Sequence, residues 1–94
     1  MYTAKELEAP SELLKDQKNL PALRKAMDPK TLPRKVEELS HSREDVIRLF
    51  AAMHPNATMD TLARRHYGML HREKNEQVLN AVKDSILKKA MRGS

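Results

Sequence analysis

Apolar residues recur at helical spacing along most of this chain, and that pattern is the strongest constraint on its fold. In the last segment, Leu79, Val82 and Ile86 stand three and four residues apart, and similar spacings recur from residue 20 onward. Such spacings place side chains on one face of an α-helix. Only three residues are aromatic and few are β-branched, so strand-forming residues are scarce. The sequence therefore predicts an all-α fold.

The length predicts one domain, because 94 residues leave room for a single core. Residues 1–10 lack periodicity and end in Pro10, so we expect a flexible N-terminal segment followed by a single helical domain over residues 11–94. A core of this size is thin, and the chain has no cysteine with which to form a disulfide. A homodimer is therefore one expected way of completing the core.

The predicted architecture is a small bundle of four to five helices. Short, angled helices are expected at Leu20 and Leu32, where a proline occupies the first turn. A helical hairpin is expected over about residues 43–67, and Gly68 would follow it as a left-handed terminating residue. A long C-terminal helix is expected from about His71 to Arg92. The expected centre of the core consists of Val46, Ile47, Phe50, Leu62, Leu79, Val82 and Ile86.

Positive charge is concentrated in the second half of the chain. The whole chain has eighteen Lys and Arg against thirteen Asp and Glu, a net charge of +5. Residues 42–94 hold ten basic and six acidic side chains, whereas residues 1–41 hold eight and seven. A basic half attracts nucleic acid or an acidic protein surface. A net charge of about 2–8 is, however, also ordinary for a small soluble domain.

The basic residues are densest in the stretch LARRHYGMLHREK, residues 62–74. Arginine makes fork-shaped contacts with phosphate or carboxylate groups, so the stretch suits either partner. The alternative is a solvated face that is partly neutralised by Glu73, Glu76 and Asp84. The candidate residues for binding nucleic acid or a partner are Arg64, Arg65, Tyr67, His71, Arg72, Lys74, Lys83, Lys88 and Lys89.

Metal binding and catalysis are not expected. His54, His66 and His71 lack the close spacing of zinc ligands, and we expect a half-buried His66 beside two solvent-facing histidines. The chain has no Gly-rich phosphate loop, no nucleophile elbow and no HExxH motif. We therefore expect a non-enzymatic protein without a metal or cofactor.

Two functions are compatible with these patterns. The first is a small nucleic-acid-binding regulatory protein that uses its basic C-terminal half for phosphate contacts with DNA. A plain helical hairpin is favoured over a DNA-reading helix–turn–helix at residues 43–67. The second is an adaptor or inhibitor that docks on a larger, acidic protein. No apolar run reaches signal-peptide or membrane-span length, so we expect a cytoplasmic protein with no membrane partner.

Overall fold

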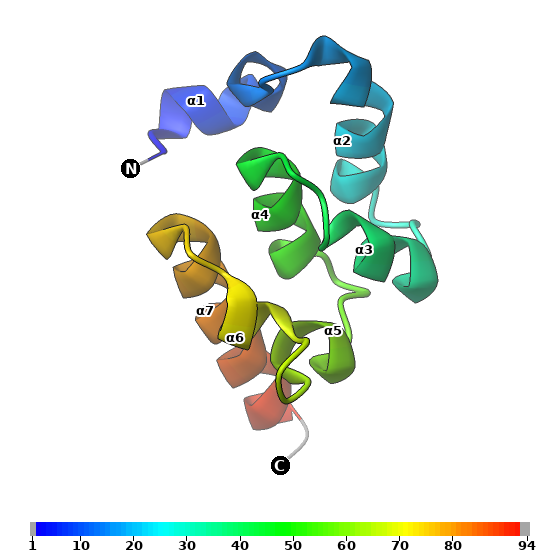
Figure 1. Ribbon diagram of the computed structural model, residues 1–94, viewed down its shortest axis with the longest axis vertical. Helices are drawn as coiled ribbons and strands as arrows, with labels where there is room; N and C mark the ends of the chain where they lie inside the picture. The colour runs from blue at the N-terminus through cyan, green and yellow to red at the C-terminus, as the bar shows by residue number, and fades with distance from the viewer. Residues whose placement is uncertain (1, 93–94) are drawn as a thin grey trace.

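The computed structural model of this chain describes residues 2–92, and its regular elements in that range are all helical (Figure 1). Two short 3₁₀ helices, η1 and η2, cover Pro10–Leu13 and Gln17–Asn19. The α-helices, in chain order, are α1 (Ala4–Glu8), α2 (Leu20–Met27), α3 (Pro33–Leu39), α4 (Asp45–Met53), α5 (Met59–Ala63), α6 (Met69–Arg72) and α7 (Glu76–Arg92). The predicted all-α fold, a small bundle with a long C-terminal helix, is confirmed. Over the expected hairpin, about residues 43–67, α4 is followed by the short α5, which packs mainly on α6 and α7 and not on α4. Several short helices add to the four or five expected.

Helix α4 lies at the centre of the bundle. It packs most extensively on α7, and α2 and α3 also pack against it, while α5 and α6 pack on each other and on α7 (Figure 1). Four residues of the predicted core centre, Val46, Ile47, Leu62 and Val82, are fully buried. Helix α4 is apolar on most sides because it is covered by helices from both halves of the chain.

Three other predicted core residues lie nearer the surface. Phe50 and Ile86 are partly buried and pack against the core. Leu79 is only partly buried, and its neighbour Val78 is fully buried in its place. Consecutive helical residues differ by about 100° around the helix axis, so only one of the two can face α4 directly. The prediction for α7 was therefore right for Val82 and wrong for Leu79, whose place in the core is taken by Val78.

Gly68 does not have the predicted left-handed conformation. Its φ is −73° and its ψ is 157°, and it forms the N-cap of α6 instead of ending α5. Helix α5 already ends at Ala63. Glycine is required at residue 68 by a close approach of the backbone, since a Cβ atom there would lie 2.3 Å from the backbone nitrogen of Arg64. The glycine therefore lets residues 64–68, hereafter the 64–68 turn, fold tightly between α5 and α6.

The long helix α7 begins at Glu76 and not near His71, because Asn75 caps it. The Asn75 side-chain oxygen accepts hydrogen bonds from the backbone N–H groups of Gln77 (2.9 Å) and Val78 (3.3 Å). His71 belongs to the separate short helix α6. None of the helices within residues 2–92 is long and apolar enough to cross a lipid bilayer.

The N-terminal segment is helical where the sequence showed no periodicity. Thr3 and Glu6 form a reciprocal capping box at the start of α1. The backbone N–H of Tyr2 donates to the side-chain oxygen of Gln77 over 2.8 Å, which ties the segment to α7. The flexibility expected for residues 1–10 stays a prediction.

Candidate nucleic-acid interface

The 64–68 turn presents its side chains to solvent. Arg64, Arg65, His66 and Tyr67 are all exposed, and Tyr67 is 75% exposed. The backbone N–H of Tyr67 donates to the carbonyl oxygen of Arg64 over 3.0 Å, which closes the turn. Three of the predicted binding residues therefore lie on one tight, accessible turn.

Arg72 holds this turn against the rest of the bundle. Its Nε donates to the carbonyl oxygen of Tyr67 over 3.0 Å. Its two terminal nitrogens donate to Ser40, one to the carbonyl oxygen (3.0 Å) and one to the hydroxyl (3.2 Å). Arg72 is partly buried, so this predicted binding residue also connects the end of α3 to α6 and the 64–68 turn.

The cluster formed by Asp45, Arg48 and Glu73 was not foreseen from the sequence. Arg48 Nε donates to one oxygen of Glu73 over 2.8 Å, and a terminal nitrogen donates to the other over 3.1 Å. The same terminal nitrogen contacts a carboxylate oxygen of Asp45. The Glu73 side chain is only 2% exposed. Because 25 residues separate Arg48 from Glu73, no local spacing rule signals this pair.

The carboxylates expected to neutralise the basic face therefore act in different ways. Glu73 is bound to Arg48, and Asp84 pairs with Lys88 over 3.0 Å one turn along α7. Glu76 forms no ion pair with any residue that the structure describes. Within residues 2–92, Lys88 is thus the only predicted binding residue that forms an ion pair.

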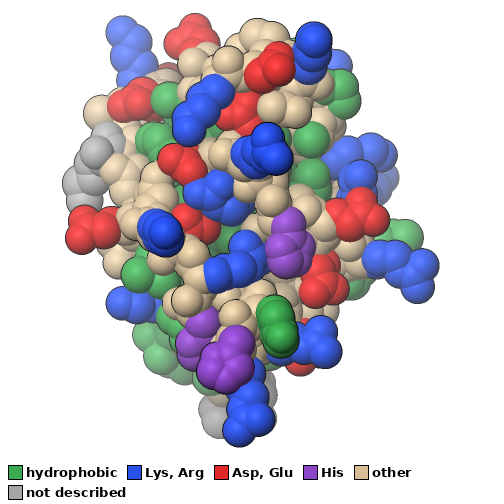
Figure 2. All heavy atoms as spheres, viewed as in Figure 1, with side chains coloured by type: hydrophobic (Ala, Val, Ile, Leu, Met, Phe, Trp, Pro, Cys, Tyr) green, Lys and Arg blue, Asp and Glu red, His purple; other side chains and the backbone are tan. Residues whose placement is uncertain are grey.

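The cations of α7 do not lie on one face. Lys83 and Lys88 are separated by five residues, which corresponds to about 140° around the helix axis. Lys74 lies before the helix, in the connection that follows α6. The predicted binding residues thus form separate groups. Figure 2 agrees with this, since Lys and Arg side chains are spread over the viewed face with Asp and Glu side chains between them.

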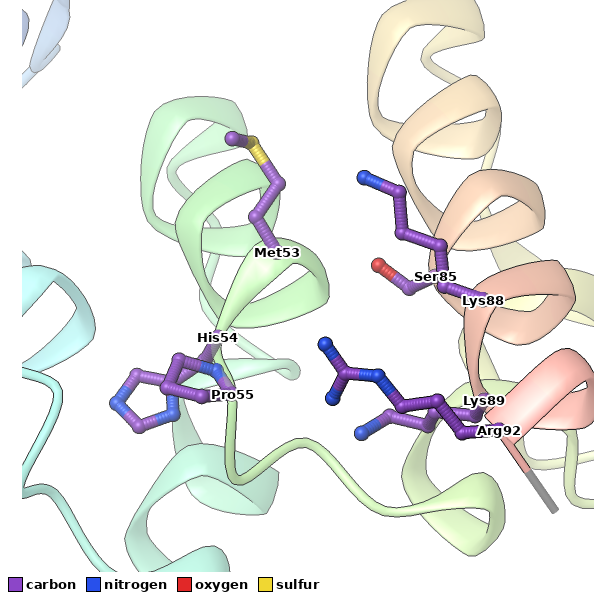
Figure 3. Close-up of a pocket in the computed structure, with 7 residues that line it drawn as sticks. All are labelled: Met53, His54, Pro55, Ser85, Lys88, Lys89 and Arg92. Atoms are coloured by element: carbon purple, nitrogen blue, oxygen red, sulfur yellow. The ribbon is translucent and has the colours of Figure 1, made fainter.

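Lys88 and Lys89 do come together with Arg92, a residue outside the predicted set. These three line an open cleft of about 210 Å³ between the end of α4 and the last turns of α7, hereafter the α4–α7 cleft (Figure 3). Figure 3 shows all three cationic side chains reaching from α7 toward the opposite wall. The remaining lining residues are Met53, His54, Pro55 and Ser85. Several cationic side chains along one wall of a cleft can contact successive negative charges of an extended anion.

The histidines are placed differently from the prediction. His66 and His71 are exposed, whereas His54 is buried. The Nδ1 of His54 accepts the backbone N–H of Asn56 (2.9 Å), and its Nε2 lies 2.6 Å from the carbonyl oxygen of Asp28, to which it donates. Both ring nitrogens of His54 are therefore used within the fold. Among the residues described, no three His, Asp or Glu side chains are placed to hold a metal ion.

No family model, no curated protein and no solved structure matches this chain. Its function is therefore inferred from the charges, clefts and exposed side chains described above.

Proposed function

We propose that this protein is a small, non-enzymatic nucleic-acid-binding regulator that holds backbone phosphates through its basic C-terminal half. The proposal rests on one observation. Over residues 42–92, basic residues outnumber acidic residues by a larger ratio among the exposed side chains than among all the residues in that range. Within residues 42–92, exposed acidic side chains without an ion pair are limited to Asp60 and Glu76. The exposed cations without an ion pair in the same range are Arg43, Arg64, Arg65, Lys74, Lys83 and Arg92.

This imbalance arises because the fold uses three carboxylates of this half internally, Glu44, Asp45 and Glu73, against two arginines, Arg48 and Arg72. Glu44 is buried against backbone N–H groups of the N-terminal half, and Asp45 and Glu73 are bound to Arg48. The cations left at the surface attract a phosphate backbone and release its counterions on binding. Buried carboxylates that are fully hydrogen-bonded are also unsuited to acid–base catalysis, which supports a non-enzymatic role.

The 64–68 turn is the favoured first point of contact. Arg64 and Arg65 are adjacent on a tight, exposed turn, and the ring of Tyr67 beside them is available to stack on an unpaired base. The α4–α7 cleft, with Lys89 and Arg92, offers a second group of phosphate contacts. Since the two groups are separate, the proposal favours backbone contacts over reading of base edges.

The test is fluorescence anisotropy with labelled duplex DNA and RNA over a range of salt concentrations. Affinity is expected to fall steeply as salt rises, with a slope set by the number of phosphates contacted. The double variant Arg64→Glu/Arg65→Glu should remove most of the affinity and reduce the salt slope by about 2. The matched control, Arg24→Glu/Arg34→Glu, makes the same charge change on exposed residues of α2 and α3 and should bind almost as the wild type does.

Absence of binding to DNA and RNA at low salt would overturn the proposal. Equal loss of affinity in the two double variants would show that binding depends only on net charge and not on the 64–68 turn.

A protein-binding role is the second candidate, and exposed apolar residues of α7 favour it. Leu87 and Met91 lie one turn apart and are 58% and 68% exposed. Such a pair suits a partner surface that covers one side of α7. An adaptor would show no salt-sensitive nucleic-acid binding, and it would retain a protein partner in a pull-down after nuclease treatment. Leu87→Glu should then release that partner.

A further inference from the structure

A second cleft lies between the start of α4 and the end of α6. It has a volume of about 230 Å³, the volume of several water molecules, and is open to solvent. Its lining residues are Ser42, Arg48, Arg72, Glu73 and Lys74, and it is hereafter the Arg72 cleft. Three of these five side chains are cationic.

Within residues 2–92, no carboxylate forms an ion pair with Arg72. Its hydrogen bonds go to the Tyr67 carbonyl and to the carbonyl and hydroxyl of Ser40, all of which are uncharged. Burial lowers the pKa of the Arg72 guanidinium; the negative charges of Glu73 and Glu37 raise it in part, and the positive charge of Arg48 lowers it. An anion bound directly to Arg72 would therefore favour its charged form.

The acidic residue of the cleft does not provide that anion. Both carboxylate oxygens of Glu73 are hydrogen-bonded to Arg48, at 2.8 and 3.1 Å, and its side chain is almost fully buried. Arg48 in turn uses its remaining terminal nitrogen on the carbonyl oxygen of Ser42 (2.8 Å). The Arg48–Glu73 pair thus lines the cleft, but its hydrogen-bonding groups are bound to each other and to Ser42.

The other side chains of the cleft still have donors to offer. A guanidinium has five N–H groups, and the three bonds of Arg72 leave one N–H on each terminal nitrogen. Lys74 is exposed and forms no ion pair with the described part of the chain. The Ser42 hydroxyl oxygen accepts the backbone N–H of Glu44 (3.1 Å), which leaves its own hydrogen available.

We propose that the Arg72 cleft binds a single phosphoryl group, held by one remaining N–H group of Arg72, the Lys74 ammonium and the Ser42 hydroxyl. Ser40 accepts from both terminal nitrogens of Arg72, so the two N–H groups that remain lie on different edges of the guanidinium and only one can reach the same anion. A tetrahedral oxyanion matches this set because its several oxygens accept from several directions. Chloride offers a single charge and no such geometry. The phosphoryl group belongs either to a nucleic-acid backbone or to a free phosphorylated molecule. Binding of a phosphoryl group in this cleft is therefore a separate property, which does not depend on the proposed nucleic-acid binding.

The probe is inorganic phosphate, added to the full chain and compared with sodium chloride at equal ionic strength. The readout is the side-chain Nε–H resonance of each arginine in a ¹⁵N-labelled sample. We expect a saturable shift at Arg72 with phosphate and not with chloride, and only a small, linear change at the exposed Arg24. A flat or linear response at Arg72 would overturn the proposal.

Two matched variants locate the site. Lys74→Gln removes one cation from the cleft and should weaken phosphate binding about tenfold. Lys18→Gln removes an exposed cation outside the cleft and outside the basic C-terminal half, and it should leave the affinity unchanged. Equal affinities in the two variants would also overturn the proposal. Because Lys74 forms no ion pair in the described structure, its substitution keeps the test independent of folding.

A competition experiment distinguishes the two sources of the phosphoryl group. If phosphate displaces a labelled oligonucleotide and Lys74→Gln weakens both, the cleft takes a backbone phosphate. If phosphate saturates Arg72 and the oligonucleotide is not displaced, the cleft takes a free phosphorylated molecule. Failure of the nucleic-acid proposal appears separately, as loss of oligonucleotide binding while the phosphate response of Arg72 remains.

Discussion

Arg48 Nε lies 2.8 Å from a carboxylate oxygen of Glu73, and this pair joins α4 to the connection between α6 and α7. Their side chains are 16% and 2% exposed. Removing the Glu73 charge would leave Arg48 with the more exposed Asp45 as its ion-pair partner among the described residues. We expect Glu73→Gln to lower the free energy of unfolding by about 1–3 kcal/mol, measured by urea denaturation.

The exposed pair between Lys35 and Glu38 is the control for this prediction. Its atoms are 3.1 Å apart, but the side chains are 48% and 62% exposed. Water screens such a pair, so Glu38→Gln should change the free energy of unfolding by less than about 1 kcal/mol. Similar losses in Glu38→Gln and Glu73→Gln would show that burial does not govern these contacts.

Gly68 provides a test of why the 64–68 turn is tight. A Cβ atom at this residue would lie 2.3 Å from the Arg64 nitrogen and 2.9 Å from its carbonyl oxygen, both of which are backbone atoms. We expect Gly68→Ala to lower the free energy of unfolding by about 2 kcal/mol or more. Gly68→Asn should be at least as harmful, because it adds a larger side chain to the same contact.

The comparison of alanine and asparagine separates two explanations for this glycine. At a left-handed residue asparagine is tolerated better than alanine. If Gly68→Asn were the more stable of the two variants in urea denaturation, the close approach to Arg64 would not be the controlling contact.

The fold class could be predicted from the sequence because helical spacing is a local property. The buried residues Val46, Ile47 and Val82 were found in this way, since each belongs to a regular apolar stripe. The wrong choice of Leu79 over Val78 in α7 has a related cause. Val78 and Leu79 are both apolar, and spacing alone cannot decide which of the two faces α4.

The candidate site was harder to predict because its properties depend on contacts between distant residues. Ser40 and Arg72 are 32 residues apart. Helical spacing rules compare residues only three or four apart, so they cannot indicate this contact. The role of Arg72 as an anchor, and the withdrawal of Glu73 from the surface, follow from those contacts. The sequence shows where the basic residues stand along the chain, but local spacing does not indicate which of them, such as Arg48 and Arg72, the fold uses internally. The binding role of the others stays a prediction.

His54 is expected to contribute to stability through both ring nitrogens. It joins the loop before α3, through Asp28, to the turn before α5, through Asn56. His54→Ala would remove one of the two donors to the Asp28 carbonyl, which also accepts the backbone N–H of Thr31 (3.1 Å), and would leave the partly buried N–H of Asn56 without its side-chain acceptor. We expect a loss of about 2–4 kcal/mol in urea denaturation, from two hydrogen bonds and a small cavity.

The exposed His71 is the matched control, and His71→Ala should change the free energy of unfolding by less than about 0.5 kcal/mol. A ring whose nitrogens are both in use is also a poor metal ligand. Zinc should therefore leave the unfolding midpoint of the wild type unchanged, and a rise that disappears in His54→Ala would contradict the hydrogen bonding described for this ring.

Glu44 is expected to make stability depend on acidic pH. Its carboxylate is buried and accepts hydrogen bonds from the backbone N–H groups of Lys15 (2.9 Å) and Asp16 (3.0 Å) and from the Asn19 side chain (2.8 Å). Burial alone would raise the pKa of this carboxyl, but the three hydrogen bonds outweigh burial and hold the pKa below its ordinary value of 4.5. The ionised form is therefore favoured by folding.

Because the folded pKa lies below the unfolded one, the contribution of Glu44 is complete above about pH 4.5 and is lost as the pH falls through the folded value. Glu44→Gln should cost about 1–3 kcal/mol at neutral pH and make the fall in unfolding free energy between about pH 5 and pH 3 shallower. A residual slope is expected from Asp45, whose pKa burial would raise but hydrogen bonds from Asn75 and Arg48 lower. Urea denaturation at several pH values measures both effects.

The exposed Glu12 is the control for this prediction. If Glu12→Gln flattened the pH profile of the unfolding free energy as much as Glu44→Gln, the acid sensitivity would not originate at the buried carboxylate.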